Sequence, residues 1–210
     1  MSNKSQINKC NPLLLASSSP RRKAILMQIG IPFKAKKSMF EEAVYRDLPP
    51  AEKVCQAAIS KARAVYEVQK KQWILGADTI VVLNDTVFGK PKDLNDCRNT
   101  LHQIKGKSHN TITGFCILNL SGEIAHLESV MTEVKIKKLR DNEIESYIKT
   151  GEPFGKAGSY AIQGVGAFMI EYIHGSYTNV VGLPAFEVVK AFIKCGAIKD
   201  FPSIKKDSIG

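Results

Sequence analysis

The segment Leu13–Arg22 reads Leu-Leu-Leu-Ala-Ser-Ser-Ser-Pro-Arg-Arg, and it passes from a strand pattern to a helix pattern within one short turn. Its apolar run, residues 13–16, is typical of a buried strand. Ser19 and Pro20 mark a helix start, because serine caps the first turn and proline fits its first position. A buried strand that turns directly into a helix is typical of α/β folds, and we expect this helix to run to about Ile29.

Outward from this segment, strand and helix patterns alternate along the chain. Alternating and β-branched runs predict strands over residues 31–36, 73–83, 87–88, 111–120, 123–136 and 168–173. Two of these strands, 111–120 and 123–136, form a long hairpin around Ser121-Gly122. Helical spacing of apolar residues predicts helices over 51–69, 95–104, 141–149 and 184–194. Residues 151–166 are interpreted as a glycine-rich loop and 175–184 as a turn-rich loop. The whole predicts an α/β fold: a mixed sheet with flanking helices.

Composition restricts the class of protein. The chain has 210 residues, 44% hydrophobic and 24% charged, which is typical of one large soluble domain or two small lobes. No apolar run approaches the ~20 residues of a membrane span, and Met1–Cys10 lacks the apolar core of a secretory signal. The five cysteines are widely spaced without a CxxC pair, which argues against disulfides or structural zinc and predicts a cytoplasmic location.

The net charge of +10 admits two interpretations, solubility or an anionic partner. The lysines lie in small scattered groups with no interleaved aromatic residues, unlike a surface that stacks single-stranded bases. We therefore expect no nucleic-acid and no membrane partner, and favour solubility over any macromolecular partner.

Arg21 and Arg22 fall in the first turn of the predicted helix, where the helix dipole disfavours cations by ~0.3–1 kcal/mol each. Free N–H groups, serine hydroxyls and two guanidinium groups at one point would suit a phosphate. The alternative, that both arginines simply point into water, fits this segment equally well.

Asp78 interrupts the apolar strand Ile74–Leu83. Burying its carboxylate would require a cation, a donor or a metal, although an aspartate bonded to nearby backbone is the ordinary alternative. Strand alternation places Asp78 on the face of Gly76 and Thr79 on the other face. Glu41-Glu42 is either a solvated turn or the source of a second carboxylate for a divalent ion such as Mg²⁺.

Taken in order, several segments of the chain resemble the Maf family. They are LASSSPRR (15–22), FEE (40–42), SKARA (60–64), GADTIVVL (76–83), KP (90–91), GEPFGKAGSYAIQG (151–164) and GSYTNVVGLP (175–184). The ordered set covers nearly all of residues 13–197, and is far more specific than any one of its parts.

The resemblance implies a Maf/ITPase-like fold with two lobes around a central cleft, a homodimer, and a divalent metal, Mg²⁺ or Mn²⁺. It implies cleavage of a nucleoside triphosphate to the monophosphate and pyrophosphate. Residue by residue, it implies that Asp78 is the general base and that Glu42 and Asp78 hold the metal. Phosphate binding is implied for Ser17, Arg21, Arg22, Lys61, Lys90 and Lys156, and substrate specificity for Arg21, Thr79 and Gln163.

The KAGSYAIQG run resembles the branch that prefers dTTP and UTP, including some modified uridine triphosphates. One departure is Gly155, where many relatives have aspartate. We expect a flexible segment 1–11, a single catalytic domain 12–200 and a polar tail 201–210. The alternative function is a non-catalytic nucleotide-binding regulator of cell division that acts through a protein partner and would dispense with Asp78 or Glu42.

Overall fold

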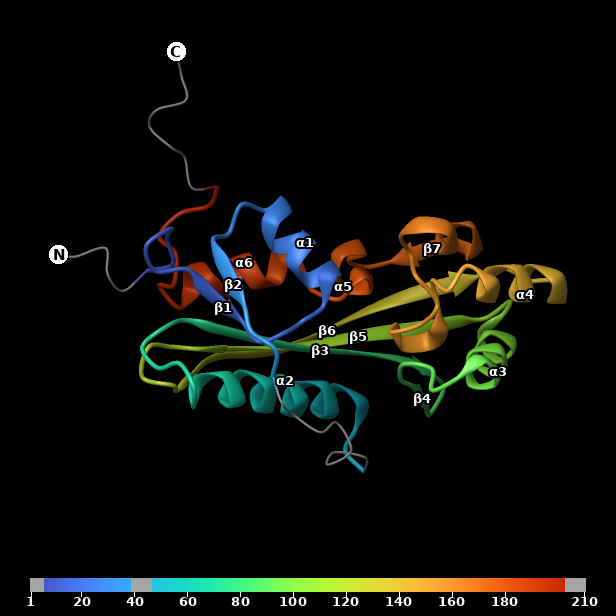
Figure 1. Cartoon of the computed structure of the whole chain (residues 1–210), viewed down its shortest axis with the longest axis horizontal. Helices are drawn as coiled ribbons and strands as arrows, with labels where there is room; N and C mark the ends of the chain where they lie inside the picture. Colours follow the sequence, from blue (N-terminus) through green and yellow to red (C-terminus); the bar gives the residue numbers. More distant parts are fainter. Residues whose placement is uncertain (1–5, 39–46, 203–210) are drawn as a thin grey trace, which may run out of the picture.

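The computed structural model describes residues 6–38 and 47–202, and its centre is a mixed sheet with the strand order β2-β1-β3-β5-β6-β7 (Figure 1). The strands are β1 (Leu13–Leu15), β2 (Phe33–Ala35), β3 (Ile74–Leu83), β4 (Thr86–Phe88), β5 (Ser108–Leu118), β6 (Ile124–Ile136) and β7 (Ile170–His174). β1 is parallel to β2 and β3, whereas β3, β5, β6 and β7 pair antiparallel and β4 pairs with β3. The predicted α/β fold with a mixed sheet is confirmed.

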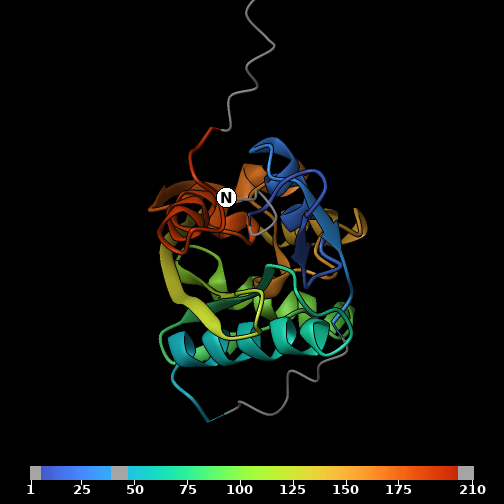
Figure 2. The ribbon, with the colours of Figure 1, turned by 90° about the vertical axis from the view of Figure 1, so that its left-hand side faces the viewer.

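Helices cover both faces of this sheet. They are α1 (Pro20–Gln28), α2 (Pro50–Tyr66), α3 (Leu94–Ile104), α4 (Asp141–Lys149), α5 (Tyr177–Val181) and α6 (Ala185–Lys194), with short 3₁₀ turns η3 (Ala157–Ser159) and η4 (Gly164–Met169). α2 lies along one face, and α1, α5 and α6 lie on the other (Figures 1 and 2). α3 and α4 lie at the far end of the long strands.

Two glycines of the sheet allow α2 to approach closely. A Cβ on Gly76 would lie 2.2 Å from the Ala58 carbonyl oxygen, and a Cβ on Gly114 would lie 2.5 Å from the Val54 carbonyl carbon. Any larger residue at either position would push the helix away from the strands. The face of α2 predicted from helical spacing, which includes Val54 and Ala58, is buried against them.

The apolar core has separate groups at the two ends of the long strands. One group includes Leu13, Phe115 and Phe192, and packs α1 and α6 onto the sheet. Another includes Leu101 and Tyr147, and packs α3 and α4. β3, β5 and β6 run through both ends, so the two lobes of the fold share one sheet.

Two local predictions need correction. Residues 175–184 contain a helix, α5, capped by the Ser176 hydroxyl and ended by Gly182 at a φ of 125°. The strand predicted over 168–173 begins at Ile170, because Phe168 belongs to η4. Both segments are short, so capping and tertiary contacts outweigh the strand or loop propensity of their residues.

Ile7 lies within the segment expected to be flexible, yet it is buried and its N–H donates to the Ala197 carbonyl at 2.8 Å. The division into residues 1–11, 12–200 and 201–210 stays a prediction. The five cysteines are free thiols. Over residues 6–38 and 47–202, no helix has the length and apolar character needed to cross a membrane.

Candidate functional site

A cavity of about 540 Å³ opens where α1 begins, between the two lobes. Among the lining residues that the structure describes, one is acidic, Asp78, and six are basic: Arg21, Arg22, Lys37, Lys61, Lys90 and Lys156. The remaining wall has an apolar part, formed by Val81, Ala157, Ala161, Ile162 and Val180. Such a cavity can bind a molecule that combines a polyanionic part with an uncharged ring.

The cavity lies at an unpaired stretch of β3. β1 pairs with β3 only as far as Leu75, and β4 pairs with it only from Val81 onward. Between these points β3 has no strand partner on this side within the described residues. Asp78 and Thr79 point to opposite faces, as predicted, yet both border the opening because the edge between them is exposed.

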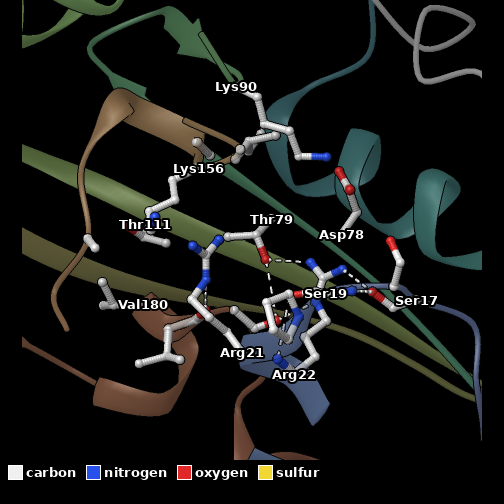
Figure 3. A pocket seen from close by; sticks show the side chains of 18 of the residues that line it. Ser17, Ser19, Arg21, Arg22, Asp78, Thr79, Lys90, Thr111, Lys156 and Val180 are labelled. Atoms are coloured by element: carbon white, nitrogen blue, oxygen red, sulfur yellow. Dashed lines mark hydrogen bonds between the residues drawn. The ribbon is translucent and has the colours of Figure 1, made fainter. Parts of the chain in front are cut away.

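Asp78 is paired with a cation from the neighbouring helix. Its Oδ1 accepts from the Nζ of Lys61 on α2 at 2.5 Å, and the two side chains are only 13% and 12% exposed. The ammonium group of Lys90 points toward the same carboxylate (Figure 3). The cation that burial of Asp78 requires is therefore present, and the carboxylate does not act as a backbone cap.

The arginines of α1 are held in the cavity wall rather than directed into water. Arg22 donates from Nε to the Gly182 carbonyl at 2.8 Å, from Nη1 to Ser17 Oγ at 3.3 Å and from Nη2 to Thr79 Oγ1 at 3.0 Å (Figure 3). Arg21 donates from Nε to the Val181 carbonyl at 3.2 Å, and burial lowers the pKa of its guanidinium. The carboxyl end of α5 thus fixes both side chains.

The far wall of the cavity is the segment that carries Lys156 and Gln163. The Lys156 ammonium donates to the Glu152 carbonyl, and burial lowers its pKa. The carboxylate of Glu152 accepts from the N–H groups of Val165 and Gly166 at 3.1 and 2.7 Å. These bonds close the segment into a loop, with Gln163 exposed on the cavity side.

Gly155 also lines the cavity, at a φ of 74° that L side chains rarely adopt, and no atom lies within 4 Å of the position of a Cβ there. An aspartate at this position would have space but would need the left-handed conformation, which aspartate tolerates better than most residues. Gly155 itself adds no charge to the wall.

The described part of the cavity offers few oxygen ligands for a divalent cation. Asp78 supplies the single carboxylate in the described lining, and the described residues contain no cluster of three or more metal-ligating side chains. Glu42 lies outside the described residues. One carboxylate suits Mg²⁺ or Mn²⁺ held largely by water and substrate phosphates, because such ions use one or two carboxylates and not an all-protein cage.

The structure brings together every predicted site residue that it describes: Ser17, Arg21, Arg22, Lys61, Asp78, Thr79, Lys90, Lys156 and Gln163. It adds Lys37, which the sequence shows only as one of a group of scattered lysines. It also adds the carboxyl end of α5, for which the Ser176 cap and the Gly182 stop were usable signals in the sequence.

The fold and cavity define a class of protein that binds a polyanionic small molecule between two lobes of a mixed α/β domain. Residues 12–195 match the family described as Maf-like protein, and the chain belongs to this family. A dTTP/UTP pyrophosphatase of Ruminiclostridium cellulolyticum is 50% identical over 82% of this chain and 90% of its own. Proteins of the same name from Syntrophotalea carbinolica and Citrifermentans bemidjiense are 46% and 45% identical, covering 91% and 90% of this chain and 88% and 98% of their own.

Among solved structures, a nucleoside-triphosphatase / dITP/XTP pyrophosphatase from Mycobacterium abscessus matches 61% of this chain and 75% of its own. Its TM-score of 0.39 and sequence identity of 14% are too low to inform the function.

Proposed function

We propose that this chain is a nucleoside triphosphate pyrophosphatase that hydrolyses dTTP, UTP and modified uridine triphosphates to the monophosphate and pyrophosphate, and so removes non-standard nucleotides. Relatives at 40–50% identity that are named dTTP/UTP pyrophosphatase support the proposal. The observation that carries it is that the described lining of the cavity combines one carboxylate, Asp78, with six basic side chains.

The basic side chains suit a triphosphate because its charge is spread over three groups. In the proposal, Ser17, Arg21 and Arg22 bind phosphate at the start of α1, and Lys61, Lys90 and Lys156 neutralise charge from the opposite walls. At an effective dielectric of about 20, the Coulomb attraction between one cation and one phosphate charge about 4 Å away is ~4 kcal/mol. The cavity therefore selects polyphosphates over uncharged nucleosides.

Asp78 acts as the general base in this proposal. It takes a proton from water as the water oxygen bonds to the α-phosphorus, and the bond to the bridging oxygen breaks with the electron pair leaving on pyrophosphate. Lys61 donates to Oδ1, and in this proposal Oδ2 is the oxygen that faces a water or a cation. Asp78 and Glu42 would hold the divalent cation, which supplies charge neutralisation at the phosphates.

A general base alone does not account for the rate enhancement of an enzyme. A positioned base contributes roughly 10²–10⁴-fold, about 3–5 kcal/mol, whereas enzymes supply about 8 kcal/mol or more. The remainder must come from cations fixed around the developing charge, which is the role given to Arg21, Arg22 and the three lysines.

Substrate choice is assigned to Arg21, Thr79 and Gln163. The Gln163 amide offers a donor and an acceptor that match O4 and N3–H of uracil or thymine. A flipped amide would offer the reverse pattern to cytosine, so the preference for dTTP and UTP is inferred from the named relatives. The proposal includes a homodimer in the cytoplasm, which light scattering of the purified protein and fractionation of cells test.

The test is product analysis with a panel of nucleoside triphosphates and either Mg²⁺ or Mn²⁺. We expect pyrophosphate and the monophosphate from dTTP and UTP, and no turnover after chelation. Release of single phosphates would identify a different hydrolase, and binding without turnover would support the regulatory alternative. Because the protein supplies few metal ligands, we expect Mg²⁺ to raise the melting temperature strongly only together with a non-hydrolysable triphosphate.

A further inference from the structure

We infer that Thr113 of β5, a residue outside the cavity, is a positioning residue that orients the Arg22 guanidinium through a hydrogen-bond relay of fixed direction. The kinetic consequence rests on the proposed function, whereas the relay itself does not. Thr113 is 0% exposed, so its hydroxyl has only protein partners.

The direction of the relay follows from the chemistry of its last acceptor. Thr113 Oγ1 lies 3.2 Å from the Asn179 carbonyl oxygen, which can only accept, so the single hydroxyl proton of Thr113 points there. Thr113 Oγ1 also lies 3.0 Å from Thr79 Oγ1 and must accept that second bond. The proton of Thr79 therefore points to Thr113, which at 3.0 Å lies closer than its other possible acceptor, the Gly182 carbonyl at 3.5 Å.

Arg22 stands at the head of this relay. Its Nη2 donates to Thr79 Oγ1 at 3.0 Å. The Thr79 oxygen can accept this bond through a lone pair while its own proton points to Thr113. The order is Arg22 to Thr79, Thr79 to Thr113, and Thr113 to the Asn179 carbonyl. Each bond polarises the next, and any reversal would leave two donors or two acceptors facing each other.

Asn179 gives the relay a rigid end. Its side chain is 0% exposed, and Nδ2 donates to the Thr111 carbonyl at 3.2 Å and to Thr132 Oγ1 at 2.9 Å. These bonds tie α5 to β5 and β6, which a helix of five residues needs because it is too short to be stable alone. The carboxyl end of α5 then accepts from Arg22 Nε through the Gly182 carbonyl.

Two routes from Asn179 therefore meet at one guanidinium group, one through α5 and one through the threonines. With Nη1 also donating to Ser17 Oγ, this planar guanidinium is held at all three of its nitrogens and cannot rotate out of its plane, so its charge is oriented before substrate arrives. One consequence concerns Thr79: with its proton committed, it influences substrate choice by holding Arg22 and not by donating to the substrate.

The first experiment detects the hydrogen-bond relay by NMR and does not depend on catalysis. In Thr113→Val the shape of the side chain is kept and the hydroxyl is lost, whereas Thr113→Ser keeps the hydroxyl. We expect the Nε–H NMR signal of Arg22, assigned by its loss in Arg22→Lys, to shift in Thr113→Val and to return in Thr113→Ser. The matched control is Thr100→Val, a buried threonine of α3 that is 6% exposed, which should leave the signal unchanged.

The second experiment measures pyrophosphate release from dTTP. We expect Thr113→Val to lower kcat/KM about tenfold and Thr113→Ser to stay within twofold of wild type. In an Arg22→Ala background, Thr113→Val should cause no further loss, because a residue that acts through Arg22 cannot act once Arg22 is removed.

An unmoved Arg22 signal in Thr113→Val, or losses that multiply in the double variant, would overturn the inference. If Thr113→Val does not fold, Thr79→Val removes the middle of the relay at a half-buried position and is read by the same signal. If the wild-type protein releases no pyrophosphate, the proposed function fails, and the NMR experiment alone still decides whether the relay exists.

Discussion

Lys61 Nζ and Asp78 Oδ1 lie 2.5 Å apart, and this pair joins the middle of α2 to the unpaired edge of β3. Because both side chains are nearly buried, removing either partner would take an opposite charge away from the other. The pair therefore gives Asp78 two roles, one in the fold and one in the proposed chemistry, which substitutions can separate.

Asp78→Asn should abolish most of the turnover while the protein keeps its fold. The amide oxygen of asparagine still accepts from Lys61, but the side chain can no longer take a proton or bind a cation strongly. We expect kcat to fall by roughly 10²–10⁴-fold; the melting temperature falls as well, because Lys61 loses the opposite charge of Asp78, but it stays above the assay temperature. Asp85→Asn, in the exposed turn after β3, is the control, and turnover of Asp78→Asn within a few-fold of wild type would refute the assignment.

Glu152→Ala should loosen the loop that carries Gln163. The carboxylate of Glu152 accepts from Val165 and Gly166, so its loss leaves two N–H groups without their acceptor. We expect the free energy of unfolding to fall by about 2 kcal/mol, and the ratio of kcat/KM for UTP over CTP to fall as well. The exposed Glu171→Ala on β7 should change neither quantity, and an unchanged UTP/CTP ratio in Glu152→Ala would contradict the role of this loop in base selection.

Stability should fall on acidification because of His109. Burial lowers the pKa of His109 to about 4, from 6.5 in the unfolded chain, while its Nε2 lies 2.8 Å from the Tyr160 hydroxyl. Between pH 6.5 and 4 His109 is protonated in the unfolded state and neutral in the folded state. The contribution of His109 to the free energy of unfolding is thus complete above pH 6.5 and falls by about 3 kcal/mol as the pH drops to 4.

Urea unfolding of wild type and His109→Gln at pH 7 and pH 4 measures this contribution. Glutamine can keep a bond to Tyr160 but does not titrate, so its stability should change less between the two pH values. His174→Gln, at an exposed position on β7, serves as the control and should behave like wild type. Equal pH dependence of wild type and His109→Gln would show that another group is responsible.

Gly114→Ala should be strongly destabilising, since its Cβ would lie 2.5 Å from the Val54 carbonyl carbon of α2. We expect a loss of about 3 kcal/mol in the free energy of unfolding, because backbone and not a flexible side chain has to move. At Gly89 no atom lies within 4 Å of the position of a Cβ, so Gly89→Ala should be nearly neutral in the same thermal or urea measurement.

Much of the fold could be predicted because its signals are local. The Ser19-Pro20 start of α1, the helical spacing of Val54 and Ala58, and the β-branched run before Asn84 each depend on neighbours within a few residues. α5 was missed because five residues give too little periodicity to compete with the turn propensity of the Gly175-Ser176 segment.

The candidate site divides in the same way. Local patterns in the sequence already indicated the candidate residues: a serine and two arginines at a helix start, and an aspartate inside an apolar strand. The folded chain was needed to show that Lys61 pairs with Asp78, that Lys37 faces the same cavity, and that Thr113 connects Arg22 to Asn179. These contacts join residues far apart in the chain, and they follow from strand register and from the early end of β1, which local patterns do not encode.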